Sequence, residues 1–230
     1  MTNRQNKGPE GAVLAEYMEC LKGYGIQEQW GPASFRWASY RDRADSDAAP
    51  VIERMPDFAA LGEIQEYMGG CTRCKLHSGR TNIVFGVGNP NARIVFVGEG
   101  PGQDEDIKGE PFVGKAGQLL TDIIEKGMKM KRGDVYIANI VKCRPPGNRN
   151  PEPDEIAACE GFLHAQLAVI RPKVICALGK FAAQTLLGTT EPISRLRGNV
   201  YEYRGIKLVP TFHPAYLLRN PDDKKLTWAD

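Results

Sequence analysis

The sequence has no long apolar segment and almost no net charge. No run approaches the roughly 18 consecutive apolar residues of a membrane-spanning helix, and the opening residues, MTNRQNKGPEG, lack the apolar core of a secretory signal. We therefore expect a cytoplasmic protein whose six cysteines are metal ligands or buried thiols and not disulfides. Because the formal net charge is only +2, any surface that binds nucleic acid has to be local.

The chain also lacks the common phosphate-binding patterns. A glycine-rich stretch, GEGPGQDED (98–106), follows the apolar run RIVFV, but no Gly-Lys-Ser/Thr comes after it and its spacing is not G-x-G-x-x-G. It carries four acidic side chains, which would repel phosphate: Glu99, Asp104, Glu105 and Asp106. Such a loop suits an attacking water or the positive charge that develops on a sugar when a glycosidic bond breaks. The alternative is a solvated acidic loop whose charges favour the N-terminus of the next helix.

Composition divides the chain near residue 56. Residues 1–56 form an N-terminal extension of unknown role, with a short amphipathic helix predicted over 12–25 and a polar linker over 41–50. Residues 57–230 carry denser structural signals and form the predicted main domain, which holds the candidate functional residues.

Short β-branched or aromatic runs alternate with helical patterns in this main domain. Strands are predicted over 93–99, 134–142, 173–179 and 207–212, and helices over 57–70, 114–128, 153–170 and 180–188. The alternation predicts an α/β fold, a three-layer α/β/α sandwich with a central, mostly parallel four-stranded sheet. Ligands of such sheets bind outside the carboxyl ends of the strands.

Candidate binding residues lie at or after these predicted strand ends. Phe112 lies in a Gly- and Pro-flanked loop, and Asn139 offers both a donor and an acceptor to a base edge. His213 can donate to a developing carbonyl anion. A wedge of the kind that enters a base stack follows it, formed by Leu217, Leu218 and Arg219. With the acidic loop, these residues predict a base pocket for glycosyl hydrolysis.

Four cysteines are spaced as candidate metal ligands. Cys71 and Cys74 form a C-x2-C pair, and Cys143 and Cys159 follow. Four thiolates hold zinc or an iron–sulfur cluster, and the spacing does not choose between them. The alternative is a redox pair at the first two positions with the others buried, although Cys143 lies in the polar stretch KCRPPGNRNP. The remaining thiols are interpreted as packed small side chains, Cys20 and Cys176.

Six motifs occur between about residue 71 and residue 230: GRTNIVFGVGNP, GEGPGQDED, PFVGKAGQLL, YIANIVKCRPPGNRNP, FHPAYLLRNP and LTW. In this order and spacing the chain resembles the uracil-DNA glycosylase superfamily, specifically the thermostable iron–sulfur type called family 4. The resemblance implies that residues 57–230 are a catalytic domain that flips uracil out of DNA and hydrolyses its N-glycosidic bond, which starts base-excision repair. It also implies a 4Fe–4S cluster bound by Cys71, Cys74, Cys143 and Cys159.

The resemblance assigns the base-binding roles to five residues. Phe112 would stack on the flipped uracil, and Asn139 would hydrogen-bond its Watson–Crick edge. Groups around Glu99 and Gly100 would complete base recognition. His213 would stabilise negative charge on the uracil O2 as the bond breaks.

The resemblance also assigns roles in catalysis and in DNA distortion. Glu105 would contact the hydrolytic water or the sugar cation, and Asp106 would support it. The space left by the flipped nucleotide would be entered by Leu217, Leu218 and Arg219. Family 1 enzymes carry an aspartate where this chain has Gly100, so that route of water activation is missing. The loop RPPGNRNP has no histidine for covalent capture of the product, so we expect turnover.

The expected partner is uracil-containing DNA, single- or double-stranded, bound by a monomer at the nucleoid. Basic side chains predicted to line the DNA face are Lys142, Arg144, Arg149, Arg195, Arg197 and Arg219. Two other functions remain open from the residues: a non-catalytic module that binds damaged DNA, and a hydrolase of free nucleosides on the same fold.

Overall fold

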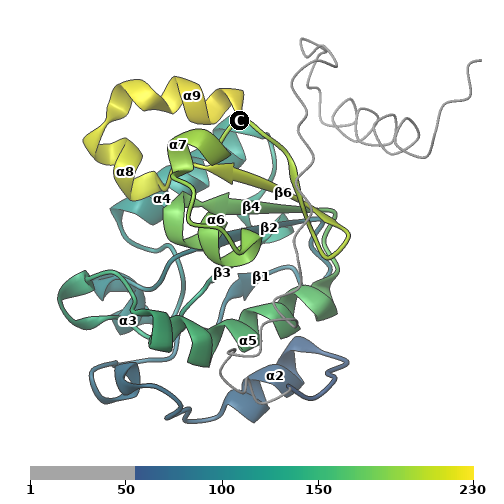
Figure 1. Cartoon of the computed structure of the whole chain (residues 1–230), viewed down its shortest axis with the longest axis vertical. Helices are drawn as coiled ribbons and strands as arrows, with labels where there is room; N and C mark the ends of the chain where they lie inside the picture. Colours follow the sequence, from purple (N-terminus) through teal and green to yellow (C-terminus); the bar gives the residue numbers. More distant parts are fainter. Residues whose placement is uncertain (1–54) are drawn as a thin grey trace, which may run out of the picture. The chain divides into compact units, whose positions relative to one another are not determined.

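The computed structural model describes residues 55–230 (Figure 1). The helix predicted over 12–25, the linker predicted over 41–50 and Cys20 lie outside the described residues. Within residues 55–230 no helix is long and apolar enough to cross a membrane.

A six-stranded sheet forms the centre of the described domain. Its strand order is β1 (Val87–Gly88), β3 (Tyr136–Asn139), β2 (Ile94–Gly98), β4 (Val174–Leu178), β6 (Ile206–Thr211) and β5 (Tyr201–Tyr203). The four inner strands are parallel, and each edge strand pairs antiparallel with its neighbour. The prediction of four strands was therefore wrong in number, although the four predicted strands are the parallel core. The two edge strands are only two and three residues long, too short to produce an alternating pattern.

Three of the longer helices follow the predicted patterns closely. α5 spans Pro153–Ile170, where proline starts the helix and Arg171 ends it in a left-handed conformation. α4 spans Lys115–Asp122 and continues into a π-helical turn over Ile123–Gly127. α6 spans Gly179–Leu187 and ends at Gly188, also left-handed. The other helices are α2 (Leu61–Met68), α3 (Gln103–Lys108), α7 (Ile193–Leu196), α8 (Pro214–Arg219) and α9 (Lys224–Ala229).

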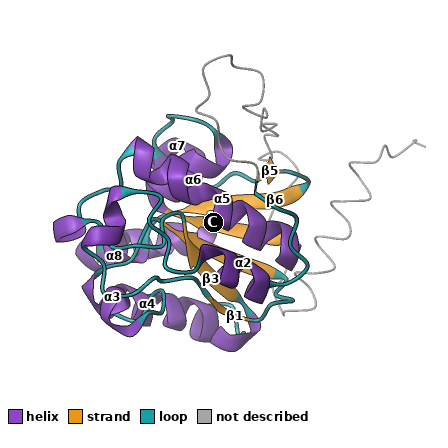
Figure 2. Ribbon diagram, turned by 90° about the horizontal axis from the view of Figure 1, so that it is seen from below, coloured by secondary structure: helices purple, strands orange, loops and turns teal. Residues whose placement is uncertain are grey.

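Helices cover both faces of the sheet (Figure 2). Successive side chains of a strand point to opposite faces, and the apolar side chains on each face pack against helices. On β2, Val95 and Val97 pack into a core with residues of α2, α5 and α6. Ile94 and Phe96, on the opposite face, pack into a second core with residues of α4. The carboxyl ends of β2, β3, β4 and β6 therefore meet at one edge of the sheet, between the two helical layers.

Candidate functional site

The segments that leave the strand ends enclose an open pocket of about 430 Å³. Its wall brings together every residue predicted to bind the base: Glu99, Gly100, Phe112, Asn139 and His213. This volume lies within the usual range for small-molecule sites. The pocket also has a polar rim, formed by residues that sequence reasoning had not connected with it: Asn148, Asn150 and Tyr216.

Asn139 is the last residue of β3 and is 1% exposed. Its Oδ1 atom has no hydrogen-bond partner within the described residues. A buried acceptor left in this state costs about 1–3 kcal/mol, so it marks a place where a ligand is expected to donate. The neighbouring Gly98 makes room for it, since a Cβ there would lie 2.4 Å from Oδ1 and 2.6 Å from Cζ of Phe112.

The ring of Phe112 forms one wall of the pocket. The residue is 6% exposed, and its ring centroid lies 5.5 Å from that of His213, with the rings tilted by 31°. Its backbone φ is +55°, a left-handed conformation that is rare for a bulky residue. The second core extends up to this ring and includes Phe96 and Leu120.

His213 begins α8, and its Nδ1 accepts a hydrogen bond of 3.1 Å from the backbone N–H of Ala215. Burial lowers the pKa of His213 to about 4, helped by the charge of Arg219 and opposed by that of Glu105. The imidazole is therefore neutral at physiological pH. Because Nδ1 acts as acceptor, the single ring proton is on Nε2, which is free to donate.

The first turn of the acidic loop shapes the opposite wall. Burial raises the pKa of Glu99 to about 7, against the charge of Lys180, so this carboxyl group takes up a proton near neutral pH. A side chain at Gly100 would force Val141 to move, because a Cβ there would lie 2.7 Å from Cγ2 of Val141.

The two acids predicted to be catalytic are placed differently. Glu105 lines the pocket, but its Oε1 accepts from the N–H groups of Val113 (2.9 Å) and Gly114 (3.0 Å), and its Oε2 accepts from Gly102 (3.1 Å). Asp106 is 3% exposed, and its Oδ1 accepts from the N–H of Thr81 at 2.8 Å and, more weakly, from the next residue. It is absent from the pocket lining among the described residues. The acidic loop therefore caps α3 and ties it to the chain before β1, but Asp106 is buried and not solvated as the alternative interpretation required.

The predicted wedge is divided between core and surface. Leu217 is 1% exposed and anchors α8, whereas Leu218 is 45% exposed. Arg219 is exposed and lies at the pocket rim.

The four predicted ligand cysteines surround a second, small cavity. Its other walls are apolar or cationic and include Met68, Phe162, Arg73, Arg80 and Lys142, with no carboxylate. No disulfide is formed by the cysteines of the described range.

The sulfur atoms of this cavity accept hydrogen bonds, while burial raises the pKa of the Cys143 and Cys159 thiols. Arg73 donates a hydrogen bond to the sulfur of Cys71, and Arg80 donates one to that of Cys143. The sulfur of Cys159 accepts from the backbone N–H of Lys142. Burial raises the pKa of Cys159 to about 12, so an empty cavity would keep that thiol protonated. No three His, Cys, Asp or Glu side chains in the described part of the chain are placed to hold a single metal ion. Four thiols around one cavity are a donor set of the kind that holds zinc or an iron–sulfur cluster.

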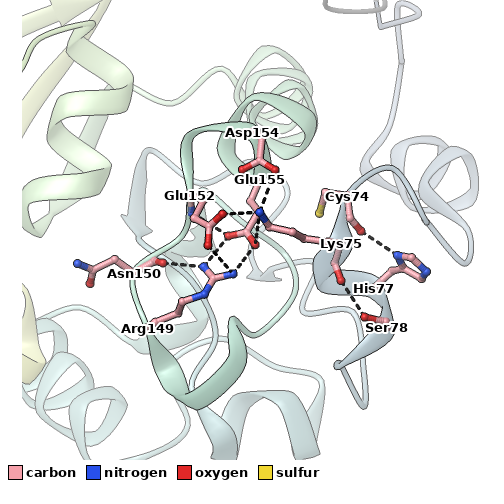
Figure 3. Close-up of polar contacts among 9 residues, drawn as sticks. All are labelled: Cys74, Lys75, His77, Ser78, Arg149, Asn150, Glu152, Asp154 and Glu155. Atoms are coloured by element: carbon pink, nitrogen blue, oxygen red, sulfur yellow. Dashed lines mark hydrogen bonds and ion pairs between the residues drawn. The ribbon is translucent and has the colours of Figure 1, made fainter.

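An ionic network joins the cysteine cavity to the pocket (Figure 3). Glu155, fully buried on α5, accepts hydrogen bonds from both terminal nitrogens of Arg149, at 2.9 and 2.6 Å. These bonds lower the pKa of the Glu155 carboxyl group. Lys75, directly after the C-x2-C pair, forms ion pairs with Glu152, Asp154 and Glu155. Because Arg149 also lines the pocket, the loop before α5 is tied to both sites.

Two of the six basic residues predicted to contact DNA are placed elsewhere. Lys142 is 1% exposed and donates from Nζ to the backbone carbonyl of Asn139 (2.9 Å) and to Oε1 of Gln166 (2.6 Å), so that prediction was wrong. Arg197 is largely buried in an ion pair with Asp230. Burial depends on tertiary packing, which the local sequence does not reveal.

The fold and the pocket define an α/β protein with a base-sized site at the carboxyl edge of its sheet. A family model described as the uracil DNA glycosylase superfamily matches residues 85–230. A type-4 uracil-DNA glycosylase of Thermotoga maritima is 53% identical over 159 residues, which cover 68% of this chain and 82% of that protein. Its counterpart in Archaeoglobus fulgidus is 48% identical over 170 residues (70% and 85%), and that of Sulfurisphaera tokodaii is 43% identical over 179 residues (74% and 81%). The chain belongs to the uracil DNA glycosylase superfamily.

Proposed function

We infer that the protein is a uracil-DNA glycosylase of the type-4 branch. It hydrolyses the bond between uracil and deoxyribose in DNA and leaves free uracil and an abasic site, the first step of base-excision repair. Family membership and the names of the three relatives support this function. The observation that carries it is the buried, unpartnered Oδ1 of Asn139 beside an aromatic ring in the pocket.

Base recognition follows from that acceptor. Uracil carries a hydrogen on N3 that Oδ1 of Asn139 accepts, whereas N3 of cytosine carries none and would leave the buried oxygen unpaired. A site that strands a buried polar group discriminates far more strongly than one that only fits a shape. Phe112 stacks on the base, and backbone groups at Glu99 and Gly100 close the pocket.

His213 stabilises the leaving group. As the bond between N1 and C1′ breaks, its electron pair moves onto the uracil ring, and Nε2–H of His213 donates to the O2 atom that gains charge. The Nδ1 bond to Ala215 supports this assignment, because it holds the ring proton on Nε2. One such donor lowers a barrier by about 3–4 kcal/mol.

The acidic loop is proposed to contact the attacking water or the sugar that becomes positively charged. Water oxygen adds to C1′ as uracil leaves, and its proton neutralises the departing anion. Glu105 faces the pocket with one acceptor position of Oε2 uncommitted, which supports contact with the water or the cationic sugar. Asp106 supports this arrangement indirectly, by fixing the first turn of α3.

The DNA strand, not a free nucleoside, is the proposed substrate. Arg219 lines the pocket and Leu218, its exposed chain neighbour, precedes it on α8; we propose that these two side chains enter the space that the flipped nucleotide leaves. We place the enzyme at the nucleoid in the cytoplasm, as a monomer that acts on single- or double-stranded DNA.

The cofactor is proposed to be a 4Fe–4S cluster held by Cys71, Cys74, Cys143 and Cys159. The cluster would supply a structural link between the C-x2-C loop, the segment after β3 and α5. Hydrogen bonds to three of the sulfurs and the cationic walls support this choice.

The test is incubation with oligonucleotides that carry one uracil, thymine or cytosine at the same position, followed by alkaline cleavage. We expect alkali-labile sites and free uracil from the uracil strand only. DNA binding without product would support the damage-binding module instead, and activity confined to deoxyuridine would support the nucleoside hydrolase.

A further inference from the structure

The loop that presents Phe112 adopts a backbone conformation that its own sequence does not favour. Among the described residues only five non-glycine positions have positive φ, and Phe112 is the only aromatic one of them. Such conformations persist where the surroundings hold them, and they gather at functional sites. The question is what holds this one.

Two charged side chains grip the loop from either side of the ring. Glu105 binds the two N–H groups that follow Phe112 in the chain, those of Val113 and Gly114. Arg132 binds the two carbonyl groups at and before it, donating from one terminal nitrogen to Pro111 (3.0 Å) and to Phe112 (2.9 Å).

Arg132 is itself well fixed. Its other terminal nitrogen donates to Oγ1 of Thr121 on α4 at 3.0 Å, and burial lowers the pKa of the guanidinium, against the charges of Glu110 and Glu125. Gly117, also on α4, lies so close that a Cβ there would be 1.9 Å from the Phe112 carbonyl oxygen. The carbonyl is thus held between α4 and the arginine.

The orientation of the ring depends on this grip. Cζ of Phe112 lies against Gly98, beside the unpartnered Oδ1 of Asn139, and the ring faces His213. If φ relaxed to its usual negative range, the ring would leave this position. Arg132 is absent from the pocket lining among the described residues, so any effect it has on the base passes through the loop that carries Phe112.

We propose that Arg132 is a positioning residue for uracil excision, which holds Phe112 in its left-handed conformation so that the ring forms the stacking wall of the base pocket. The proposal rests on the proposed function for its catalytic consequence, but the grip on the loop is a property of the fold and is testable without catalysis.

The first test is a double-mutant cycle in single-turnover excision of uracil. Stacking on a base contributes about 5- to 150-fold, so Arg132→Met is expected to slow excision by about 10-fold or more, and by no more than Phe112→Ala does. In the Phe112→Ala background the same change should alter the rate less than about threefold, because the ring it positions is gone. Equal losses in both backgrounds would overturn the proposal.

The matched control is Thr121→Val, which removes one bond of Arg132 but leaves both carbonyl bonds. We expect a rate within about twofold of the wild type. Arg132→Lys keeps the charge and one donor group, so its excision rate should lie between those of Arg132→Met and the wild type. If Arg132→Met does not fold, Arg132→Lys takes its place in the double-mutant cycle.

The second test is hydrogen exchange of the segment 110–117. Arg132→Met should speed exchange of the Val113 and Gly114 amides by about 10-fold or more, while Thr121→Val should not. If exchange is faster in Arg132→Met but the wild-type protein excises no uracil, Arg132 holds the loop and the proposed function is refuted. Unchanged exchange would overturn the grip even if excision is normal.

Discussion

The base pocket and the cysteine cavity begin at the two ends of one short segment, yet they are completed in opposite ways. Asn139 ends β3 inside the pocket, and Cys143 lies four residues later at the cavity. In the pocket a buried acceptor has no partner, and glycine leaves space beside it. In the cavity the sulfur atoms accept hydrogen bonds and have cationic neighbours.

This difference separates what each region contributes. Unpaired polar groups in the pocket reduce stability and are retained for a ligand that comes and goes. The thiols in the cavity have raised pKa values, so they lose their protons only when a metal binds. A permanently bound metal centre would therefore be part of the folded structure. Substitutions in the pocket should therefore affect activity more than stability, and substitutions in the cavity should affect both.

The largest effect is expected from Cys143→Ser. If the proposed cluster is bound, removing one ligand should release it, and because metal-binding free energy contributes to folding free energy, the melting temperature should fall by about 10 °C or more. Iron content and visible absorbance should fall with it. The control is Cys176→Ser, which changes a partly buried cysteine of β4 outside the cavity and should leave the iron content unchanged. A colourless wild-type protein that is no more stable than Cys143→Ser would refute the distinction between the two regions.

The next largest effect is expected from His213→Ala, a loss of about two to three orders of magnitude in the single-turnover rate. His213 also caps α8, so this change should lower stability by about 1 kcal/mol. His213→Asn separates the two roles, since asparagine caps a helix but lacks the imidazole. Because the asparagine amide can also donate, an active His213→Asn enzyme would show that the imidazole itself is not required.

A smaller loss, about 100-fold, is expected from Gly98→Ala. The new methyl group would overlap both Oδ1 of Asn139 and the Phe112 ring, and displacements of about 1 Å commonly reduce rates to this extent. Gly62→Ala is the matched control on α2, where a Cβ has open space. If Gly98→Ala retains full activity, the pocket does not bring these two groups together on the substrate.

The smallest effect concerns stability against pH and tests Glu99. Its folded pKa is raised, so its contribution to stability is fully present below the unfolded value and is lost as pH rises through about 7. Between pH 5 and 8 the wild type should lose about 1–2 kcal/mol relative to Glu99→Gln, measured by urea unfolding at each pH. His213, whose folded pKa is lowered to about 4, acts in the opposite direction below about pH 6.5 and is common to both proteins. A constant difference would show that Glu99 is not buried enough to matter.

Sequence patterns identified the parallel core and the pocket because both depend on local signals. The runs that form β2, β4 and α5 alternate or persist long enough to reveal their type, and chemically distinctive residues such as Asn139 and His213 follow the strand ends. The cysteines were likewise recognisable from their type, and the structure gathers all four around one cavity.

Other features depend on contacts between distant segments and leave no local signal. Lys142 was predicted to line the DNA face but is buried, with its Nζ bonded to Asn139 and to Gln166 of α5. Arg132 drew no prediction from the sequence, although it binds the carbonyl group of Phe112, 20 residues earlier. Glu105 lies where a catalytic acid was predicted, yet most of its acceptor capacity serves backbone N–H groups. Which acid faces the water was therefore not readable from the loop sequence.

Asn139→Leu separates the stability of the pocket from its activity when the melting temperature and the rate of uracil release are measured on one preparation. If Oδ1 of Asn139 is kept unpaired for uracil at a cost in stability, the melting temperature should equal or exceed that of the wild type, because a buried unsatisfied oxygen is removed. Uracil release should then be slower by about 100-fold or more. A less stable protein that still releases uracil at the wild-type rate would show that Asn139 serves the fold and not the base.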